Sequence, residues 1–281
     1  MTGHRIHRTT SDDGTGIAGT VQGQGPPLVL LHGGLEDGDF CWREMLPFLE
    51  DQFTCYLMNR RDRGLSDPST DLSPERLLED TIAFLDSISE PVSVIGESDG
   101  AALALAGAAR SDAVSAVAVY EPTVFDVVTD DVAARIENAL PRISQTVDEG
   151  RLSDAAREFA EVVANDDELA TLSAMDYWKD AGRFIATELQ EMEQSIEHDG
   201  PSPTDAALLG KITAPVLVLS GSRTRLHTWF TAGVRHITDH VANAQSREIA
   251  GAGHFGVALE PETIANEMVA FLTRPAKYTD S

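Results

Sequence analysis

A serine between two glycines is the residue of this sequence whose setting best supports covalent chemistry. Gly96-Glu97-Ser98-Asp99-Gly100 fits the pattern G-x-S-x-G, directly after the apolar run VSVI and before an alanine-rich stretch. Glycines at a tight strand-to-helix turn avoid clashes and leave the serine Oγ exposed, while the following helix directs its positive end at the site. Ser98 is therefore predicted to be a nucleophile. The alternative is a passive serine in a glycine-rich turn.

A histidine from elsewhere in the chain must complete such a site, because a serine is a poor nucleophile until a base takes its proton. His254 lies in the glycine loop GAGHF, between the last predicted strand and the last predicted helix. It follows the serine late in the chain, in the order serine, acid, histidine. His254 is predicted to be the general base, and most of the other histidines are predicted to be surface or turn residues.

The segment His32-Gly33-Gly34 ends another apolar run and could bind a developing negative charge. Backbone N–H groups aimed at a carbonyl oxygen stabilise the oxyanion that forms during attack. The N–H groups of Gly34 and Asp99 are the predicted donors. The glycines are also explained by the sharp bend of the chain alone, and both explanations can hold together.

These motifs lie at the ends of alternating apolar runs and helical patterns, which predict a mostly parallel, twisted sheet with helices on both faces. Ser73 is predicted to be the N-cap of its helix, with a proline at the first helical position. The predicted strands are 5–10, 16–22, 28–32, 53–58, 91–96, 114–120, 215–219 and 246–249. The predicted helices between them are 40–49, 73–89, 101–110, 228–241 and 261–273.

Residues 123–210 differ from the rest because no convincing strand occurs among them. Amphipathic patterns predict helices over 131–149, 153–164, 166–176 and 181–198. A helical insertion between two parts of one sheet is the simplest interpretation. The predicted domains are therefore a core of residues 1–122 and 211–281 and a helical cap of residues 123–210. The final eight residues are predicted to be a frayed tail.

The composition is strongly acidic, with a formal net charge of −25 over 281 residues. Such a charge argues against nucleic acid or an anionic membrane surface as a partner, because both would repel the chain. Apolar runs are too short to span a bilayer, and the N-terminal residues contain no apolar segment typical of a secretory signal. The two cysteines, Cys41 and Cys55, do not form a disulfide framework, so a cytoplasmic location is expected.

Lysine occurs only at Lys179, Lys211 and Lys277, and arginine supplies the other basic residues. An acidic, lysine-poor surface indicates adaptation to high salt, where ions screen self-repulsion. An ordinary acidic bacterial protein with arginine-biased codons is the alternative. Neither interpretation bears on the chemistry, and the oligomeric state stays open.

Taken together, the motifs resemble the α/β-hydrolase family with a cap domain. The segment NRRDRGLSD at 59–67 is similar to the family's D-x-R-G-x-G-x-S loop after the fourth strand, with Asn59 at the usual aspartate and Leu65 near the usual glycine. Val119-Tyr120-Glu121-Pro122 resembles a bacterial subgroup with Tyr-Glu-Pro after the sixth strand. The resemblance covers nearly the whole chain except the helical insertion. It implies the α/β-hydrolase fold and a serine-nucleophile mechanism.

The family usually has its third catalytic residue, an acid, in a Gly-x-x-Asp turn after the seventh strand. Here that turn reads Gly221-Ser222-Arg223-Thr224, and no Asp or Glu occurs from Ala206 to Thr238. Relatives with the acid after the sixth strand imply Glu121 as the acid, paired with the histidine. Asp126 is the second candidate. The remaining alternatives are that Glu121 only anchors the loop and that the site works without an acid.

The resulting hypothesis is a serine hydrolase that cleaves a small or medium carboxylic ester, thioester or lactone through an acyl-enzyme. The same residues also serve carbon–carbon bond hydrolysis and perhydrolysis. An aspartate nucleophile, as in epoxide hydrolases, is disfavoured because Ser98 occupies that position. A non-enzymatic ligand-binding protein is the alternative that Thr224 supports. No metal or other cofactor is expected, since no HxH, HExxH or CxxC spacing and no phosphate loop or dinucleotide fingerprint occurs.

Overall fold

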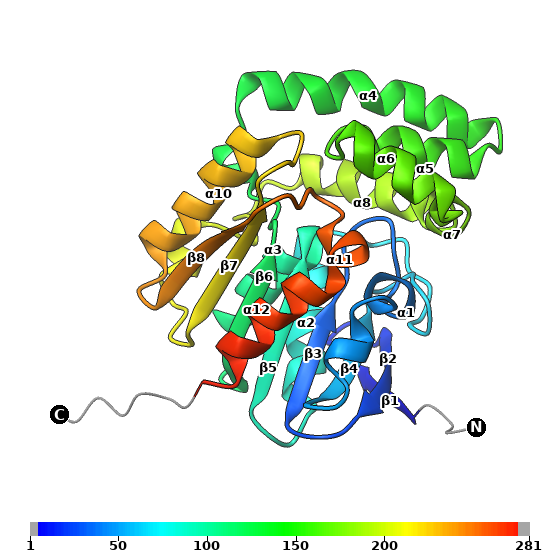
Figure 1. Cartoon of the computed structure of the whole chain (residues 1–281). Helices are drawn as coiled ribbons and strands as arrows, with labels where there is room; N and C mark the ends of the chain where they lie inside the picture. Colours follow the sequence, from blue (N-terminus) through cyan, green and yellow to red (C-terminus); the bar gives the residue numbers. More distant parts are fainter. Residues whose placement is uncertain (1–4, 275–281) are drawn as a thin grey trace.

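An eight-stranded sheet is the frame of the molecule in the computed structural model, which describes residues 5–274 (Figure 1). The strand order is β1-β2-β4-β3-β5-β6-β7-β8, and β2 runs antiparallel to both β1 and β4. All other neighbouring strands are parallel. The strands are β1 Arg5–Thr10, β2 Gly16–Gly23, β3 Pro27–Leu31, β4 Thr54–Asn59, β5 Val92–Glu97, β6 Val114–Tyr120, β7 Val216–Gly221 and β8 Ala244–Ile249.

The central strands are buried on both faces, which explains why their sequences are continuous apolar runs rather than alternating ones. Every residue of β3 and β7 is buried. The register aligns Leu31 of β3 with Gly96 of β5, and Glu97 with Tyr120 of β6. The carboxyl ends of β3, β5, β6 and β7 therefore meet at one edge, where ligands bind in open α/β sheets.

Helices cover both faces of the sheet, as the sequence predicts. One face packs against α2 Pro74–Asp86, α3 Ser98–Ala108 and α10 His227–His240. The other packs against α1 Gly38–Trp42, η1 Leu46–Phe48 and α12 Pro261–Leu272. A short helix, α11 Gly256–Leu259, follows the β8 loop and was not predicted.

One of the predicted helices of the core is wrong, and the predicted N-cap of another is confirmed in its position. The single helix predicted over 40–49 is two short pieces, α1 and η1, because Pro47 lacks the N–H that a continuous helix needs there. Ser73 is at the N-cap position of α2, but its hydroxyl makes no capping bond. It donates instead to Asp71 Oδ1 over 2.8 Å.

The helical segment 123–210 lies above the carboxyl ends of the strands, with α4 outermost (Figure 1). It contains η2 Phe125–Val127, α4 Asp130–Asp148, α5 Leu152–Ala160, α6 Asp166–Ala174, α7 Tyr177–Ala181, α8 Ile185–Glu197 and α9 Ala206–Leu209. The helix predicted over 181–198 is wrong in its first turn, because the chain bends between α7 and α8. Gly182, at the end of α7, lets the chain pack closely against the start of α5, since a Cβ there would lie 2.9 Å from the Leu152 carbonyl carbon.

This segment has a hydrophobic core of its own, built around Ile143, Leu172, Trp178 and Ile185, which also contacts Leu35. Among residues 5–274, no helix has both the length and the apolar character needed to cross a bilayer. The predicted frayed tail lies outside the described residues except for Arg274.

Candidate active site

Ser98 occupies the sharp turn between β5 and α3. Its backbone has a positive φ of 52°, a left-handed conformation that is unfavourable for a serine and is typical of functional sites. Two glycines make the turn possible. A Cβ on Gly96 would lie 2.4 Å from the Gly100 carbonyl oxygen, and one on Gly100 would lie 2.3 Å from that of Leu31. The G-x-S-x-G pattern therefore follows from close backbone packing around Ser98.

His254 reaches Ser98 from the loop between β8 and α11. Its Nε2 lies 3.3 Å from Ser98 Oγ. The ring stacks on Phe230, with 5.1 Å between the ring centroids. The loop is held on both sides of the histidine: the Tyr120 hydroxyl donates to the Gly253 carbonyl oxygen, and the Phe255 N–H donates to Glu168 Oε1 over 2.7 Å. These contacts fix the orientation of the imidazole.

Glu121 contacts the far side of the same imidazole. Its Oε2 lies 2.8 Å from His254 Nδ1, and its Oε1 accepts a hydrogen bond of 2.8 Å from the Gly221 N–H. The residue is fully buried and has a positive φ of 43°. Burial lowers the pKa of His254, but the hydrogen bond and charge of Glu121 outweigh this, so the pKa is raised. Ser98, His254 and Glu121 thus form one hydrogen-bonded chain.

The other two residues considered for the acid lie in different surroundings. Asp126 is exposed in η2 and accepts hydrogen bonds of 2.6 Å from the hydroxyls of Ser202 and Thr204. Thr224 is buried, and its Oγ1 has no hydrogen-bond partner among residues 5–274. The structure thus brings Glu121 to the histidine, whereas Asp126 ties η2 to the chain before α9.

The two predicted oxyanion donors, Gly34 and Asp99, line one cavity together with Ser98. The glycine loop runs against the nucleophile, since a Cβ on Gly33 would lie 3.2 Å from Ser98 Cβ. The Asp99 carboxylate accepts a 2.6 Å hydrogen bond from Thr123 Oγ1. His32 holds the loop from below: its Nδ1 donates to the Gly33 carbonyl oxygen over 2.8 Å, and its Nε2 accepts from the Arg60 N–H.

The cavity above Ser98 has a volume of about 450 Å³, a size that suits a small or medium organic molecule. Its walls are mostly apolar and come from both the sheet edge and the helical segment 123–210. Side chains that line it include Leu103, Ile136, Leu140, Phe159, Trp229 and Val257. The cavity is polar near the nucleophile and apolar elsewhere. It therefore fits a substrate that has one reactive polar group and an apolar body.

Comparison with known proteins agrees with this architecture. Residues 28–267 match the model of a family described as the Alpha/beta hydrolase family. The chain belongs to that family. A relative of this hydrolase is the 2-hydroxy-6-oxo-6-(2'-aminophenyl)hexa-2,4-dienoic acid hydrolase of Metapseudomonas resinovorans, which is 24% identical over 92% of this chain and 87% of its own.

Solved structures of several hydrolases share the fold. An alpha/beta hydrolase from Sphaerobacter thermophilus superposes with a TM-score of 0.71 at 27% identity, over 95% of this chain and 100% of that one. An esterase from a Rhodococcus species gives a TM-score of 0.75 at 19% identity, over 95% and 98% of the two chains. At 19% identity, the similarity to the esterase concerns the fold alone. Family and fold together support a hydrolase.

Sequence reasoning missed a group of buried charges beside the active site of this hydrolase. Arg60 and Arg63, from the loop after β4, pair with Glu188 and Glu191 of α8. Arg63 Nη2 lies 2.9 Å from both Glu188 Oε2 and Glu191 Oε2, and Arg60 donates to Glu191 Oε1. All four residues are buried. Three arginines after β4, at positions 60, 61 and 63, are the sequence feature linked to this cluster, but they do not indicate which acids pair with them.

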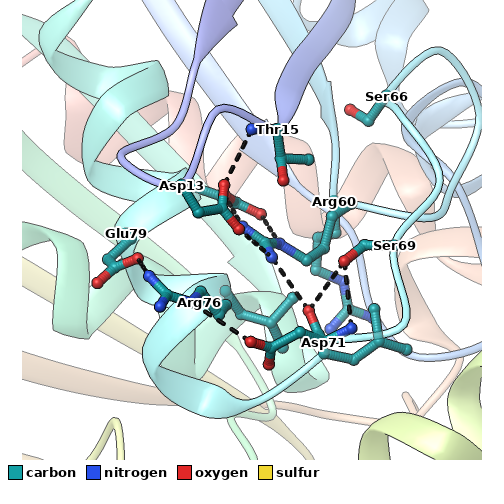
Figure 2. Close-up of polar contacts among 12 residues, drawn as sticks. Asp13, Thr15, Arg60, Ser66, Ser69, Asp71, Arg76 and Glu79 are labelled. Carbon is teal, nitrogen blue, oxygen red and sulfur yellow. Dashed lines mark hydrogen bonds and ion pairs between the residues drawn. The ribbon is translucent and has the colours of Figure 1, made fainter.

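The same loop of the hydrolase is anchored on its other side by Arg61. This buried guanidinium forms two hydrogen bonds with the Asp80 carboxylate, of 2.6 and 2.7 Å. Its Nη1 also donates to Asp13 Oδ2 over 2.9 Å and to the Asp71 carbonyl oxygen over 3.0 Å. Figure 2 shows Asp13 and Asp71 close together at this anchor. The loop is thereby fixed between α8 on one side and α2 and the β1–β2 turn on the other.

A second unpredicted cluster lies behind the glycine loop. Glu36, Cys41 and Glu97 bring one ligand atom each to within 4.8 Å of one another, a grouping that could hold a metal ion. These groups already have protein partners, because Tyr177 donates to Glu36 and the Cys41 thiol lies 3.8 Å from Glu97 Oε1. Burial raises the pKa of Cys41 and of Glu97, which favours the protonated form of both groups. The arrangement therefore fits an internal hydrogen-bonded cluster better than an ion site.

Proposed function

We propose that this hydrolase cleaves a small or medium carboxylic ester, thioester or lactone through an acyl-enzyme on Ser98. The observation that carries the proposal is the hydrogen-bonded chain from Ser98 Oγ through His254 to Glu121, with separations of 3.3 and 2.8 Å. Such a chain activates a serine for attack on a carbonyl carbon. A protein that only binds a ligand has no need of a serine activated in this way.

In the proposed reaction, Ser98 Oγ attacks the carbonyl carbon while His254 Nε2 takes its proton. Glu121 holds the ring so that Nδ1 carries the other proton, and it stabilises the imidazolium. The backbone N–H groups of Gly34 and Asp99 bind the oxyanion. His254 then protonates the leaving group, and water that it activates in turn releases the acid product from Ser98.

The helical segment 123–210 would act as the cap over a core of residues 1–122 and 211–281. Its own hydrophobic cluster supports treating it as a separate unit. We also propose a cytoplasmic location and a small-molecule substrate. The two buried free cysteines and the apolar cavity favour these assignments.

Carbon–carbon bond hydrolysis is the second candidate. It is favoured by the relative named for the hydrolysis of a dienoic acid, and the same three residues could serve it. Hydrolysis of p-nitrophenyl esters of graded chain length, compared with hydrolysis of a vinylogous 1,5-diketone, would separate the two.

The experiment that tests the proposal is labelling with a fluorophosphonate probe. Stoichiometric modification of the wild-type protein and none of Ser98→Ala is the expected result. An unmodified wild-type protein would favour a ligand-binding role, whereas a label that persists in the variant would assign the nucleophile to a residue other than Ser98.

A further inference from the structure

Glu188 of α8 lies directly over the glycine loop that is proposed to bind the oxyanion. A Cβ on Gly34 would lie 2.6 Å from both the Cδ and Oε1 of Glu188, so only a glycine leaves room for this carboxyl group. The Glu188 side chain is 2% exposed and lines the cavity together with Ser98 and Asp99. It therefore lies against Gly34, one of the two proposed oxyanion donors, and shares the cavity with Asp99, the other.

The two oxygens of Glu188 have different partners. Oε2 accepts a 2.9 Å hydrogen bond from Arg63 Nη2. Oε1 has no hydrogen-bond partner among residues 5–274, although the side chain is almost fully buried. Oε1 is not one of the fully enclosed side-chain atoms that lack a partner, and Glu188 lines the cavity, so this oxygen is accessible to a ligand bound there.

We propose that Glu188, as a neutral acid, is a further catalytic residue that donates a hydrogen bond from Oε1 to the oxyanion held by Gly34 and Asp99. This inference rests on the proposed serine mechanism. The guanidinium of Arg63 can only donate, so it requires Oε2 as the acceptor and leaves the proton on Oε1. A preorganised donor in a dry site stabilises the transition state without any proton transfer.

The charges around Glu188 favour its neutral form. The charged groups that act most strongly on Glu188 are the guanidinium groups of Arg60 and Arg63 and the carboxylates of Glu191 and Asp99. Their formal charges cancel, so an ionised Glu188 would leave one uncompensated buried negative charge. Burial, followed by the charges of Asp99 and Glu191, raises the pKa of Glu188 to about 8 in spite of the two arginines.

An ionised Glu188 would be harmful to catalysis as well as unable to donate. A carboxylate beside Gly34 would oppose the negative charge that develops on the substrate oxygen. We therefore expect kcat/KM to fall as pH rises through about 8, where Glu188 loses its proton. This alkaline limb is separate from the acid limb that His254 produces at lower pH.

The test compares pH profiles of wild-type protein and Glu188→Gln between about pH 5.5 and 9.5, with p-nitrophenyl butyrate as the neutral substrate. In the variant, Arg63 holds the amide oxygen and the NH₂ group takes the position of Oε1. This gives a donor that does not titrate. Glu188→Gln should keep activity within about tenfold of wild type at pH 7 and lose the alkaline limb. Glu188→Leu should lose about 10²- to 10³-fold in kcat.

Glu191→Gln is the matched control, because Glu191 pairs with the same arginines but has both oxygens occupied. It should keep the alkaline limb and move it to lower pH, since removing a neighbouring negative charge eases the ionisation of Glu188. An alkaline limb that is missing in the wild type, or that persists unchanged in Glu188→Gln, would overturn the proposal. The Gln profile decides the question even if the Leu variant fails to fold.

An aliphatic trifluoromethyl ketone separates this inference from the proposed function, because its adduct with Ser98 carries an oxyanion. Inhibition that weakens above about pH 8 in the wild type, but not in Glu188→Gln, is the expected result. Inhibition with the same pH dependence in both proteins would remove Glu188 from the oxyanion site and leave the serine mechanism standing. Failure to form any adduct would overturn both.

Discussion

Glu121 Oε2 lies 2.8 Å from His254 Nδ1, although the two residues follow different strands, β6 and β8. The strand between them, β7, ends at Gly221, whose N–H binds the other oxygen of the same carboxylate. The carboxylate is therefore held at the end of β7 as well as by the histidine. This arrangement leaves the position of the usual acid, Thr224, without a role in the chain of hydrogen bonds.

Replacement of Glu121 by Gln should lower kcat by about 10²- to 10⁴-fold, because the histidine loses the group that fixes its tautomer and stabilises the imidazolium. The pKa of His254 is raised in the wild type, so kcat/KM rises with pH through a value above the ordinary 6.5. In Glu121→Gln this acid limb should move to lower pH. Steady-state kinetics over the acid range measures both effects.

Asp126→Asn is the control for that variant. It should weaken only the tie of η2 to Ser202 and Thr204, with kcat close to wild type. A large loss in Asp126→Asn with full activity in Glu121→Gln would assign the acid to Asp126. If neither change matters, the site works with Ser98 and His254 alone.

Ser98→Ala should remove essentially all esterase activity, by about 10³-fold or more, because no other group can form the acyl-enzyme. The thermal midpoint should stay near that of the wild type, since only one hydroxyl is lost. Turnover of p-nitrophenyl esters in a highly purified preparation checks the first point and thermal unfolding the second. Substantial residual turnover would remove Ser98 from the mechanism.

Thr224→Val should leave activity intact and raise the free energy of unfolding by about 1 kcal/mol, since it removes a buried hydroxyl that has no partner. Thr20→Val is a matched control, because the buried Thr20 hydroxyl donates to Asp39 over 2.9 Å. That change should lower stability instead. Urea unfolding of both variants gives the comparison, and a strong loss of activity in Thr224→Val would return this residue to the catalytic site.

Thermal stability should rise with salt, because ions screen the repulsion among 46 acidic side chains. Exposed ion pairs such as Arg151 with Glu149 weaken in salt, but each contributes little. Thermal midpoints in low and molar KCl measure the balance. A midpoint that falls or stays constant would favour the ordinary acidic protein with arginine-biased codons.

Much of the fold could be predicted because local patterns determine it. Apolar runs predicted the positions of the strands, and the strand–turn–helix context of Ser98 singled out the nucleophile. The break between α1 and η1 was missed although Pro47 stands in the sequence, because the apolar spacing continues through it. A proline, which lacks the N–H, is thus a better indicator of a helix break than the spacing of apolar residues.

The buried charges could not be predicted in the same way. Glu188 and Glu191 lie on an amphipathic helix, where acidic residues normally face water. Their burial depends on Arg63, which is 125 positions away from Glu188 in the sequence. Only the packing of α8 on the loop after β4 reveals that the two acids turn inward. Glu188 and Glu191 were therefore missed, whereas the nucleophile and the base were found.

Helix α8 is fastened to the loop after β4 along most of its length. The bonded side chains are spaced about one turn apart: Thr187 to Asp62, Glu188 and Glu191 to the arginines, and Gln194 to the Leu72 N–H. Helix α8 can move away from the cavity only if all these hydrogen bonds break together. The outer helix α4 also lines the cavity and, among residues 5–274, makes no comparable series of side-chain bonds to the core. New substrate preferences in this protein would therefore arise more readily through changes in α4, which can reshape the apolar space without disturbing the chemistry at Ser98.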